Sequence, residues 1–197
     1  MSAGRTWVIE NHDPEDADVA GILEQLLGRD GTLPPEHWRN RAPLVLAVDG
    51  RSGAGKTSLA ARLAAAAAAR CPAGVVLFHL EDLYPGWDGL TEGVRLWTEM
   101  LTRLLDGRDT AWRAWDWAAG APDPAERILS AEAALIIAEG VGASAPGHPE
   151  VVPDLTVWLQ LPAAQRRRRA LARDGELYRP HWERWAAQED ALLARLP

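Results

Sequence analysis

One eight-residue run constrains the fold more than any other feature of this sequence. Residues 50–57 read Gly-Arg-Ser-Gly-Ala-Gly-Lys-Thr, which is the spacing G-x-x-x-x-G-K-[ST] of a phosphate-binding loop. The run follows an apolar stretch, residues 44–48, and opens an alanine-rich stretch, residues 56–70. This order predicts a strand, a loop and a helix, in which backbone N–H groups and the helix N-terminus together hold phosphate oxygens.

The loop predicts which residues contact a nucleotide. Lys56 is expected to reach the β and γ phosphates, and the hydroxyl of Thr57 is expected to bind Mg²⁺. Lys56 is the single lysine of the chain, against 20 arginines, and a compact ammonium suits this position better than a planar guanidinium. The alternative is an ordinary glycine-rich loop with a solvated lysine, and the flanking strand and helix argue against it. The predicted nucleotide-binding residues are Gly50, Ser52, Gly53, Ala54, Gly55, Lys56, Thr57 and Ser58.

Apolar strands alternate with amphipathic helices along the rest of the chain. Strands are predicted at 44–48, 75–78, 134–138 and 155–161, and helices at 18–27 with Asp18 as N-cap, 56–70, 91–105, 163–173 stopped by Gly175, and 181–196. This alternation is typical of a three-layer α/β/α fold with a mainly parallel central sheet. We expect one domain over residues 1–197, with an N-terminal helix and connection at 1–43, a core at 44–161, and a lid and C-terminal helix at 162–197.

Composition excludes several classes of protein. The chain has 197 residues, 47% of them apolar, and a formal charge of −7, so it is predicted to be globular and to bind no nucleic acid. One cysteine, Cys71, forms no internal disulfide, which fits a reducing cytoplasm. We expect no secretory signal and no membrane span, because the most apolar helical stretch, 59–71, is short and contains arginines.

Further absences narrow the kinds of nucleotide-binding protein. A GTPase normally reads guanine with an Asn-Lys-x-Asp loop, and the only lysine of this chain lies in the phosphate loop. The chain is short for an AAA-type motor and has no LSGGQ run. Its size is common among small-molecule and nucleoside kinases.

Acidic residues follow two of the predicted strands. Glu139 comes directly after the apolar strand 134–138, at the edge where open α/β sheets bind ligands, and is a candidate Mg²⁺ ligand; an exposed loop residue is the alternative. The strand 75–78 delivers His79, Glu81 and Asp82 to the same edge, where a general base for a substrate hydroxyl is expected.

Three arginines of the helix 163–173 share one face. Arg166, Arg169 and Arg173 have the spacing i, i+3 and i+7. They are candidates for a lid that closes on phosphates, or for one face of a solvated charged helix.

From about residue 44 to 174 the sequence resembles the uridine kinase branch of the P-loop nucleoside and nucleotide kinases. The resemblance rests on the run 47–57, on the Glu-Gly pair at 139–140, on the R-x-x-R-x-x-x-R-D pattern at 166–174, and more loosely on Glu81-Asp82-Leu83-Tyr84 and Trp115-Asp116-Trp117. It implies a P-loop NTPase fold with an arginine-rich lid helix, and transfer of phosphate from ATP with Mg²⁺ to a hydroxyl of a small molecule.

The resemblance also implies roles for individual residues. Glu81 or Asp82 would be the catalytic base, Lys56 and the arginines would stabilise the phosphates, and Thr57 with Glu139 would hold Mg²⁺. The substrate would lie against Tyr84, Trp115, Asp116 and Trp117. The family's histidine after the last segment is missing here, since the chain continues Ala118-Ala119-Gly120.

Two other functions stay open from the sequence. One is an ATP-binding regulatory or accessory protein that phosphorylates no small molecule, and the other is a kinase for a metabolite other than a nucleoside. A homodimer is compatible with the sequence.

Overall fold

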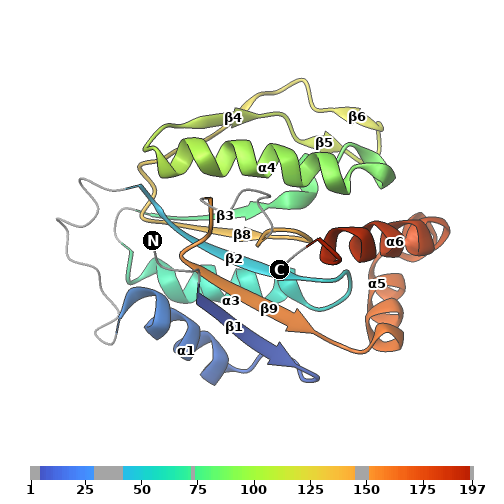
Figure 1. Ribbon diagram of the computed structural model, residues 1–197, viewed down its shortest axis with the longest axis horizontal. Helices are drawn as coiled ribbons and strands as arrows, with labels where there is room; N and C mark the ends of the chain where they lie inside the picture. The colour runs from blue at the N-terminus through green and yellow to red at the C-terminus, as the bar shows by residue number, and fades with distance from the viewer. Residues whose placement is uncertain (1–4, 29–41, 72–73, 145–150, 196–197) are drawn as a thin grey trace.

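A parallel β-sheet forms the centre of the molecule (Figure 1). The computed structural model describes residues 5–28, 42–71, 74–144 and 151–195, and within these ranges five strands make up this sheet. In order across the sheet they are β1 (Arg5–Glu10), β9 (Leu155–Gln160), β2 (Leu44–Gly50), β8 (Leu135–Glu139) and β3 (Val75–His79). All neighbouring pairs are parallel.

The four predicted strands are confirmed, with ends that differ by one or two residues. The strand β1 is not among the predictions. It lies at the edge of the sheet, and only Ile9 of its six residues is buried. An edge strand buried at one position has little of the apolar alternation by which strands are recognised.

Helices cover both faces of the sheet, so the predicted three-layer fold is confirmed. The helices α1 (Asp16–Leu27) and α3 (Lys56–Ala68) lie on one side, and α4 (Leu90–Leu105) lies on the other (Figure 1). Successive side chains of a strand point to opposite faces, and β2 divides its residues accordingly. Val45 and Ala47 pack in the core beneath α4, whereas Leu46 and Val48 pack with α1 and α3.

Several helix ends differ from the predictions. The N-cap of α1 is Glu15 and not Asp18; the Glu15 N–H donates to the Asp18 carboxylate at 2.7 Å in a capping box. The segment α5 (Ala163–Tyr178) is broken at Gly175, whose φ of +54° is not helical, so the first helical part ends there as predicted and a short second part continues to Tyr178. After the short helix η3 (Arg179–His181), α6 covers Trp182–Leu193 rather than 181–196.

Smaller elements complete the fold on the α4 side. The short helices η1 (Leu80–Leu83) and η2 (Gly86–Asp88) lead from β3 to α4. After α4, β4 (Thr110–Trp112) pairs with β7 (Arg127–Leu129), and β5 (Trp115–Asp116) pairs with β6 (Ala121–Pro122), both antiparallel. These elements are missing from the sequence-based prediction, because two- and three-residue strands have no measurable periodicity.

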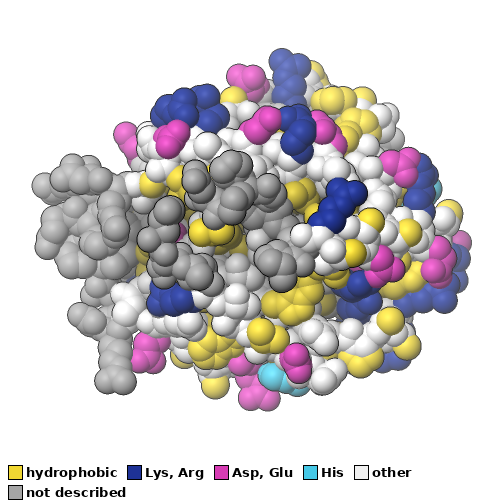
Figure 2. All heavy atoms as spheres, viewed as in Figure 1, with side chains coloured by type: hydrophobic (Ala, Val, Ile, Leu, Met, Phe, Trp, Pro, Cys, Tyr) yellow, Lys and Arg dark blue, Asp and Glu magenta, His cyan; other side chains and the backbone are white. Residues whose placement is uncertain are grey.

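The distribution of charge on the surface and the segments that connect the helices and strands point to no particular function. Figure 2 shows basic and acidic side chains interspersed on the face viewed there. No helix among the described residues is long and apolar enough to cross a membrane. Most of the predicted connection at 28–43 lies outside the described residues, and the division of the chain into one domain with three parts stays a prediction.

A buried carboxylate joins the end of β2 to the loop after β8. Asp49 is 1% exposed. It accepts hydrogen bonds from the N–H of Gly50 at 2.6 Å, from the N–H groups of Gly142 and Ser144 at 2.9 Å each, and from the Ser144 hydroxyl at 2.6 Å. The loop that begins at Gly140 is thus tied to the strand that carries the phosphate loop.

We predict that Asp49→Ala lowers the free energy of unfolding by about 3 kcal/mol, because several buried N–H groups lose a charged acceptor. Urea denaturation measures this change. Asp106→Ala, which removes an exposed partner of Arg108, is the control and should change the stability by less than about 0.5 kcal/mol. A loss below about 1 kcal/mol for Asp49→Ala would contradict this role.

Candidate active site

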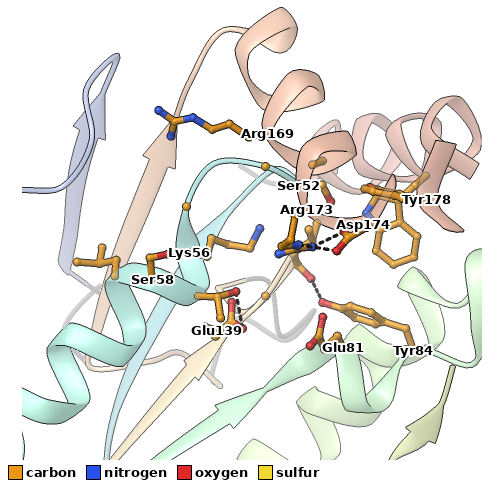
Figure 3. A pocket seen from close by; sticks show the side chains of 18 of the residues that line it. Ser52, Lys56, Ser58, Glu81, Tyr84, Glu139, Arg169, Arg173, Asp174 and Tyr178 are labelled. Carbon is orange, nitrogen blue, oxygen red and sulfur yellow. Dashed lines mark hydrogen bonds and ion pairs between the residues drawn. The ribbon is translucent and has the colours of Figure 1, made fainter. Parts of the chain in front are cut away.

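One cavity of about 650 Å³ lies at the carboxyl edge of the sheet. It is lined by the loop 52–58, by residues of η1 and η2, by Glu139 to Val141, and by one face of α5. Figure 3 shows Lys56, Glu139, Glu81 and Arg173 around one space, with Ser58 and Arg169 toward one end and Tyr84 and Tyr178 toward the other. The cavity thus brings together residues that are far apart in the chain.

The loop between β2 and α3 has two glycines at which there is no room for a side chain. Gly50 and Gly53 have φ of +138° and +80°, which residues with side chains rarely adopt. A Cβ at Gly50 would lie 2.4 Å from the carbonyl oxygen of Leu159, and a Cβ at Gly53 would lie 2.2 Å from that of Arg166. The loop is therefore packed directly against the end of β9 and the beginning of α5.

The predicted nucleotide-binding residues mostly line the cavity. Ser52, Gly53, Gly55, Lys56, Thr57 and Ser58 do so, whereas Gly50 and Ala54 do not. The ammonium of Lys56 donates to the carbonyl oxygen of Arg51 at 3.2 Å. Burial lowers the pKa of Lys56, and the carboxylates of Glu139, Glu189 and Asp49 oppose this shift.

Glu139 is the buried acid at the centre of the site. Its carboxylate is 5% exposed, and Oε1 accepts from the hydroxyl of Thr57 at 3.1 Å and from Nδ1 of His79 at 2.7 Å. The hydrogen bond with Glu139 is the main reason that the pKa of His79 is raised. Among the described residues, no group of three or more His, Cys, Asp or Glu side chains gathers as metal ligands.

The two candidate bases lie in different surroundings. Glu81 lines the cavity, whereas Asp82 does not and pairs with Arg127 at 2.9 Å. The Glu81 side chain is exposed, but the solvent that it contacts fills the cavity, which protein groups surround. Partial desolvation, and then the charge of Glu139, raise the pKa of Glu81.

The three predicted lid arginines do not act as one face. Arg169 and Arg173 line the cavity. Arg169 forms a two-pronged ion pair with Asp13 at 2.6 and 3.0 Å, and Arg173 pairs with the neighbouring Asp174 at 2.7 Å. Arg166 is 7% exposed and lies outside the cavity lining, where it bonds to backbone carbonyl groups.

Aromatic rings form the wall at the end of the cavity beyond Glu81. Of the predicted substrate residues, Tyr84 and Trp117 belong to this wall, and Trp115 and Asp116 do not. Asp116 is exposed and accepts from the N–H groups of Ala118 and Ala119, so it caps the turn after β5. The hydroxyl of Tyr84 donates to the carbonyl oxygen of Val141 at 2.9 Å.

Three further rings of this wall are absent from the sequence-based prediction. They are Trp87, Tyr178 and Trp185. Trp87 stacks on Tyr178 with ring centroids 5.2 Å apart, and it contacts Trp117 at 4.8 Å. The high tryptophan content, ten residues, was the only signal in the sequence, and it does not say which rings converge.

The N-terminal region also reaches the cavity, which the sequence did not indicate. Asp13 and Pro14, from the connection between β1 and α1, line the cavity, and Asp13 pairs there with Arg169. Arg62 of α3 donates to the carbonyl oxygen of Pro14 at 2.6 Å and pairs with Asp16 at 2.7 Å. The segment before the phosphate loop therefore builds part of the cavity wall.

Comparison with known proteins supports this architecture. No family model matches the chain, and no curated protein matches its sequence. Among solved structures, one named "Possible Uridine Kinase" from Bacillus stearothermophilus is 21% identical, with a TM-score of 0.52 over 73% of this chain and 85% of that chain. Another, a "putative fructose transport system kinase" from Silicibacter sp. TM1040, is 20% identical, with a TM-score of 0.59 over 91% of this chain and 86% of that chain.

The chain has the fold of P-loop kinases. The P-loop is the loop 50–57, and the sheet order places it on β2, between β9 and β8. The resemblance to the uridine kinase branch is confirmed in the fold. At these sequence identities the comparisons show the fold alone. The reaction and its substrate have to be inferred from the residues that line the cavity.

Proposed function

We propose that the protein transfers a phosphoryl group from ATP to a hydroxyl of a small molecule, and that the acceptor carries a planar ring, as a nucleoside does. One observation carries this proposal. A complete P-loop and a carboxylate in a protein-walled position, Glu81, face the same cavity. A donor loop and a candidate base in one cavity are the parts that phosphoryl transfer to an alcohol requires.

The P-loop half of the cavity supplies the donor site. The N-terminus of α3 and the N–H groups of the loop attract the phosphates, and the ammonium of Lys56 lies among them. Arg169 and Arg173, on the opposite wall, add positive charge. Preorganised positive groups of this kind stabilise the charge that moves onto the phosphate oxygens during transfer.

The residues at the centre of the site fit Mg²⁺. The hydroxyl of Thr57 and the carboxylate of Glu139 are hard oxygen donors 3.1 Å apart. Mg²⁺ in such sites takes only one or two carboxylates and completes its shell with water and substrate phosphates. When bound, the metal would neutralise the phosphates and polarise them for transfer.

The other half of the cavity receives the acceptor. We assign Glu81 as the base that accepts the proton of the attacking hydroxyl, since it faces the cavity and its raised pKa suits that task. The aromatic wall, which includes Tyr84, Trp87 and Trp117, offers apolar faces for a planar ring. This wall favours a nucleoside over a sugar or a sugar acid.

The proposal predicts that Lys56→Ala reduces ATP-dependent phosphorylation by about 100-fold or more while the protein stays folded, because one preorganised cation is lost from the transition state. Transfer of labelled γ-phosphate to a panel of nucleosides, sugars and sugar acids measures the activity, and thermal unfolding checks the fold. Arg108→Ala, which removes an exposed cation, is the control. Near-normal turnover of Lys56→Ala would refute the donor site.

The same assay identifies the acceptor class. A labelled nucleoside supports the proposal as stated, and a labelled sugar or sugar acid would move the acceptor to another class. ATP binding without any labelled acceptor would favour the regulatory alternative.

The assignment of the base predicts a difference between two neighbouring carboxylates. Glu81→Gln should lower kcat by about 100-fold, because general base catalysis is lost. Asp82→Asn should leave kcat near the wild-type value, because the Asp82 side chain pairs with Arg127 outside the cavity lining. A larger loss for Asp82→Asn than for Glu81→Gln would exchange the two roles.

A further inference from the structure

A buried acid on α6 touches the backbone of the P-loop. The carboxylate of Glu189 is 1% exposed, and its Oε1 accepts from the N–H of Ser52 at 2.8 Å. The two residues are 137 positions apart in the chain. Burying a carboxylate costs free energy unless it is paired and hydrogen-bonded. The partners of Glu189 therefore have to be accounted for.

Arg166, the ion-pair partner of Glu189, binds the carbonyl oxygen of Ser52. The guanidinium of Arg166, also buried, donates to the carbonyl oxygen of Ser52 at 3.1 Å and lies 3.8 Å from Oε2 of Glu189. Its Nε donates to the carbonyl oxygen of Leu161 at 3.1 Å. The N–H and the C=O of Ser52 are thus each held by one member of a buried ion pair, and that pair is anchored to the end of β9.

The position of Ser52 decides how the following amides point. Gly53, the next residue, has a positive φ and packs against the backbone of Arg166, where a Cβ would lie 2.2 Å from the carbonyl oxygen. The N–H groups of the P-loop bind phosphate only when they turn into the cavity. Holding Ser52 at both ends preorganises this turn before a nucleotide arrives.

We propose that Glu189 is a positioning residue for nucleotide binding, which with Arg166 holds the P-loop in its phosphate-binding shape. This rests on the proposed function, because it assumes that the P-loop binds ATP. Arg166 would then differ from Arg169 and Arg173, which line the cavity, because its guanidinium binds the loop backbone outside the cavity lining.

The same turn of α6 contacts the acceptor side of the cavity. The amide nitrogen of Gln188 donates to the carbonyl oxygen of Trp87 at 2.7 Å, and its oxygen accepts from the N–H of Leu90 at 3.4 Å. Adjacent residues of one helix therefore hold the donor loop and the aromatic wall, so the spacing between the two halves of the cavity depends on α6.

The test is the affinity for MgATP, measured by calorimetry for wild type and three variants. Glu189→Gln should weaken binding by about tenfold, which corresponds to replacing one charge-assisted hydrogen bond by a neutral one and leaving the Arg166 charge unpaired. Asp190→Asn, which removes a side-chain ion pair with Arg51 and leaves the loop backbone untouched, should bind as wild type does. Wild-type affinity in Glu189→Gln would overturn the proposal.

A double variant separates positioning from simple charge balance. Glu189→Met with Arg166→Met replaces the buried ion pair by apolar side chains, which restores stability in other buried pairs. We expect the double variant to fold with a lower melting temperature, because the N–H and C=O of Ser52 lose their partners, and to bind MgATP about tenfold more weakly than wild type. Wild-type affinity in this folded double variant would mean that the pair only balances charge, and the proposal would be wrong.

A measurement on the wild type decides the case if the variants do not fold. Hydrogen exchange of the Ser52 amide without nucleotide should be slow, because the N–H is held by a buried carboxylate. Exchange at the rate of an exposed loop would contradict the proposal. Absence of MgATP binding by the wild type would instead refute the proposed function, and this inference with it.

Discussion

The candidate site depends on two positions in the P-loop where there is no room for a side chain. Gly50 lies against the backbone of Leu159, and Gly53 lies against that of Arg166. Because the loop is seated so closely on the end of β9 and the beginning of α5, its amides, the first turn of α3 and the face of α5 that carries Arg169 and Arg173 surround one space. Any side chain at either glycine would push these parts away from each other.

Buried acidic residues then hold the pieces in register. Asp49 joins the end of β2 to the loop after β8. Glu139, at the end of β8, binds Thr57 and His79. Glu189 joins α6 to the P-loop. Each carboxylate accepts hydrogen bonds from groups far away in the sequence. Each therefore fixes the position of a strand end or a helix relative to the other segments around the cavity. Close to the phosphate-binding loop, these negative charges also oppose the effect of burial on the pKa of Lys56.

Sequence patterns predicted the parts of the site that belong to local motifs. The P-loop could be recognised because its residues are consecutive and its flanking strand and helix are strongly apolar. Glu139 and Glu81 could be found because each lies at or just after the end of an apolar strand, and parallel strands end at one edge of the sheet. The choice between Glu81 and Asp82 required the structure, because only Glu81 lines the cavity.

The rest of the site could not be predicted, because it is built by contacts between distant segments. The edge strand β1 is mostly exposed, yet it leads into the connection that brings Asp13 to Arg169. Helical spacing alone placed Arg166 with Arg169 and Arg173, but the closeness of Glu189 and the P-loop backbone draws Arg166 away from the cavity. Likewise, nothing in the sequence separates Trp87 and Trp185, which line the cavity, from Trp115, which does not.

The most direct test of the account is a crystal structure with Mg²⁺ and a non-hydrolysable ATP analogue. We expect the triphosphate to lie against the N–H groups of residues 53–58. The ammonium of Lys56 should leave the carbonyl oxygen of Arg51, its partner in the absence of nucleotide, and contact the phosphates. An analogue bound outside this cavity, or bound while Lys56 keeps its contact with Arg51, would contradict the central claim that this loop holds the phosphate donor.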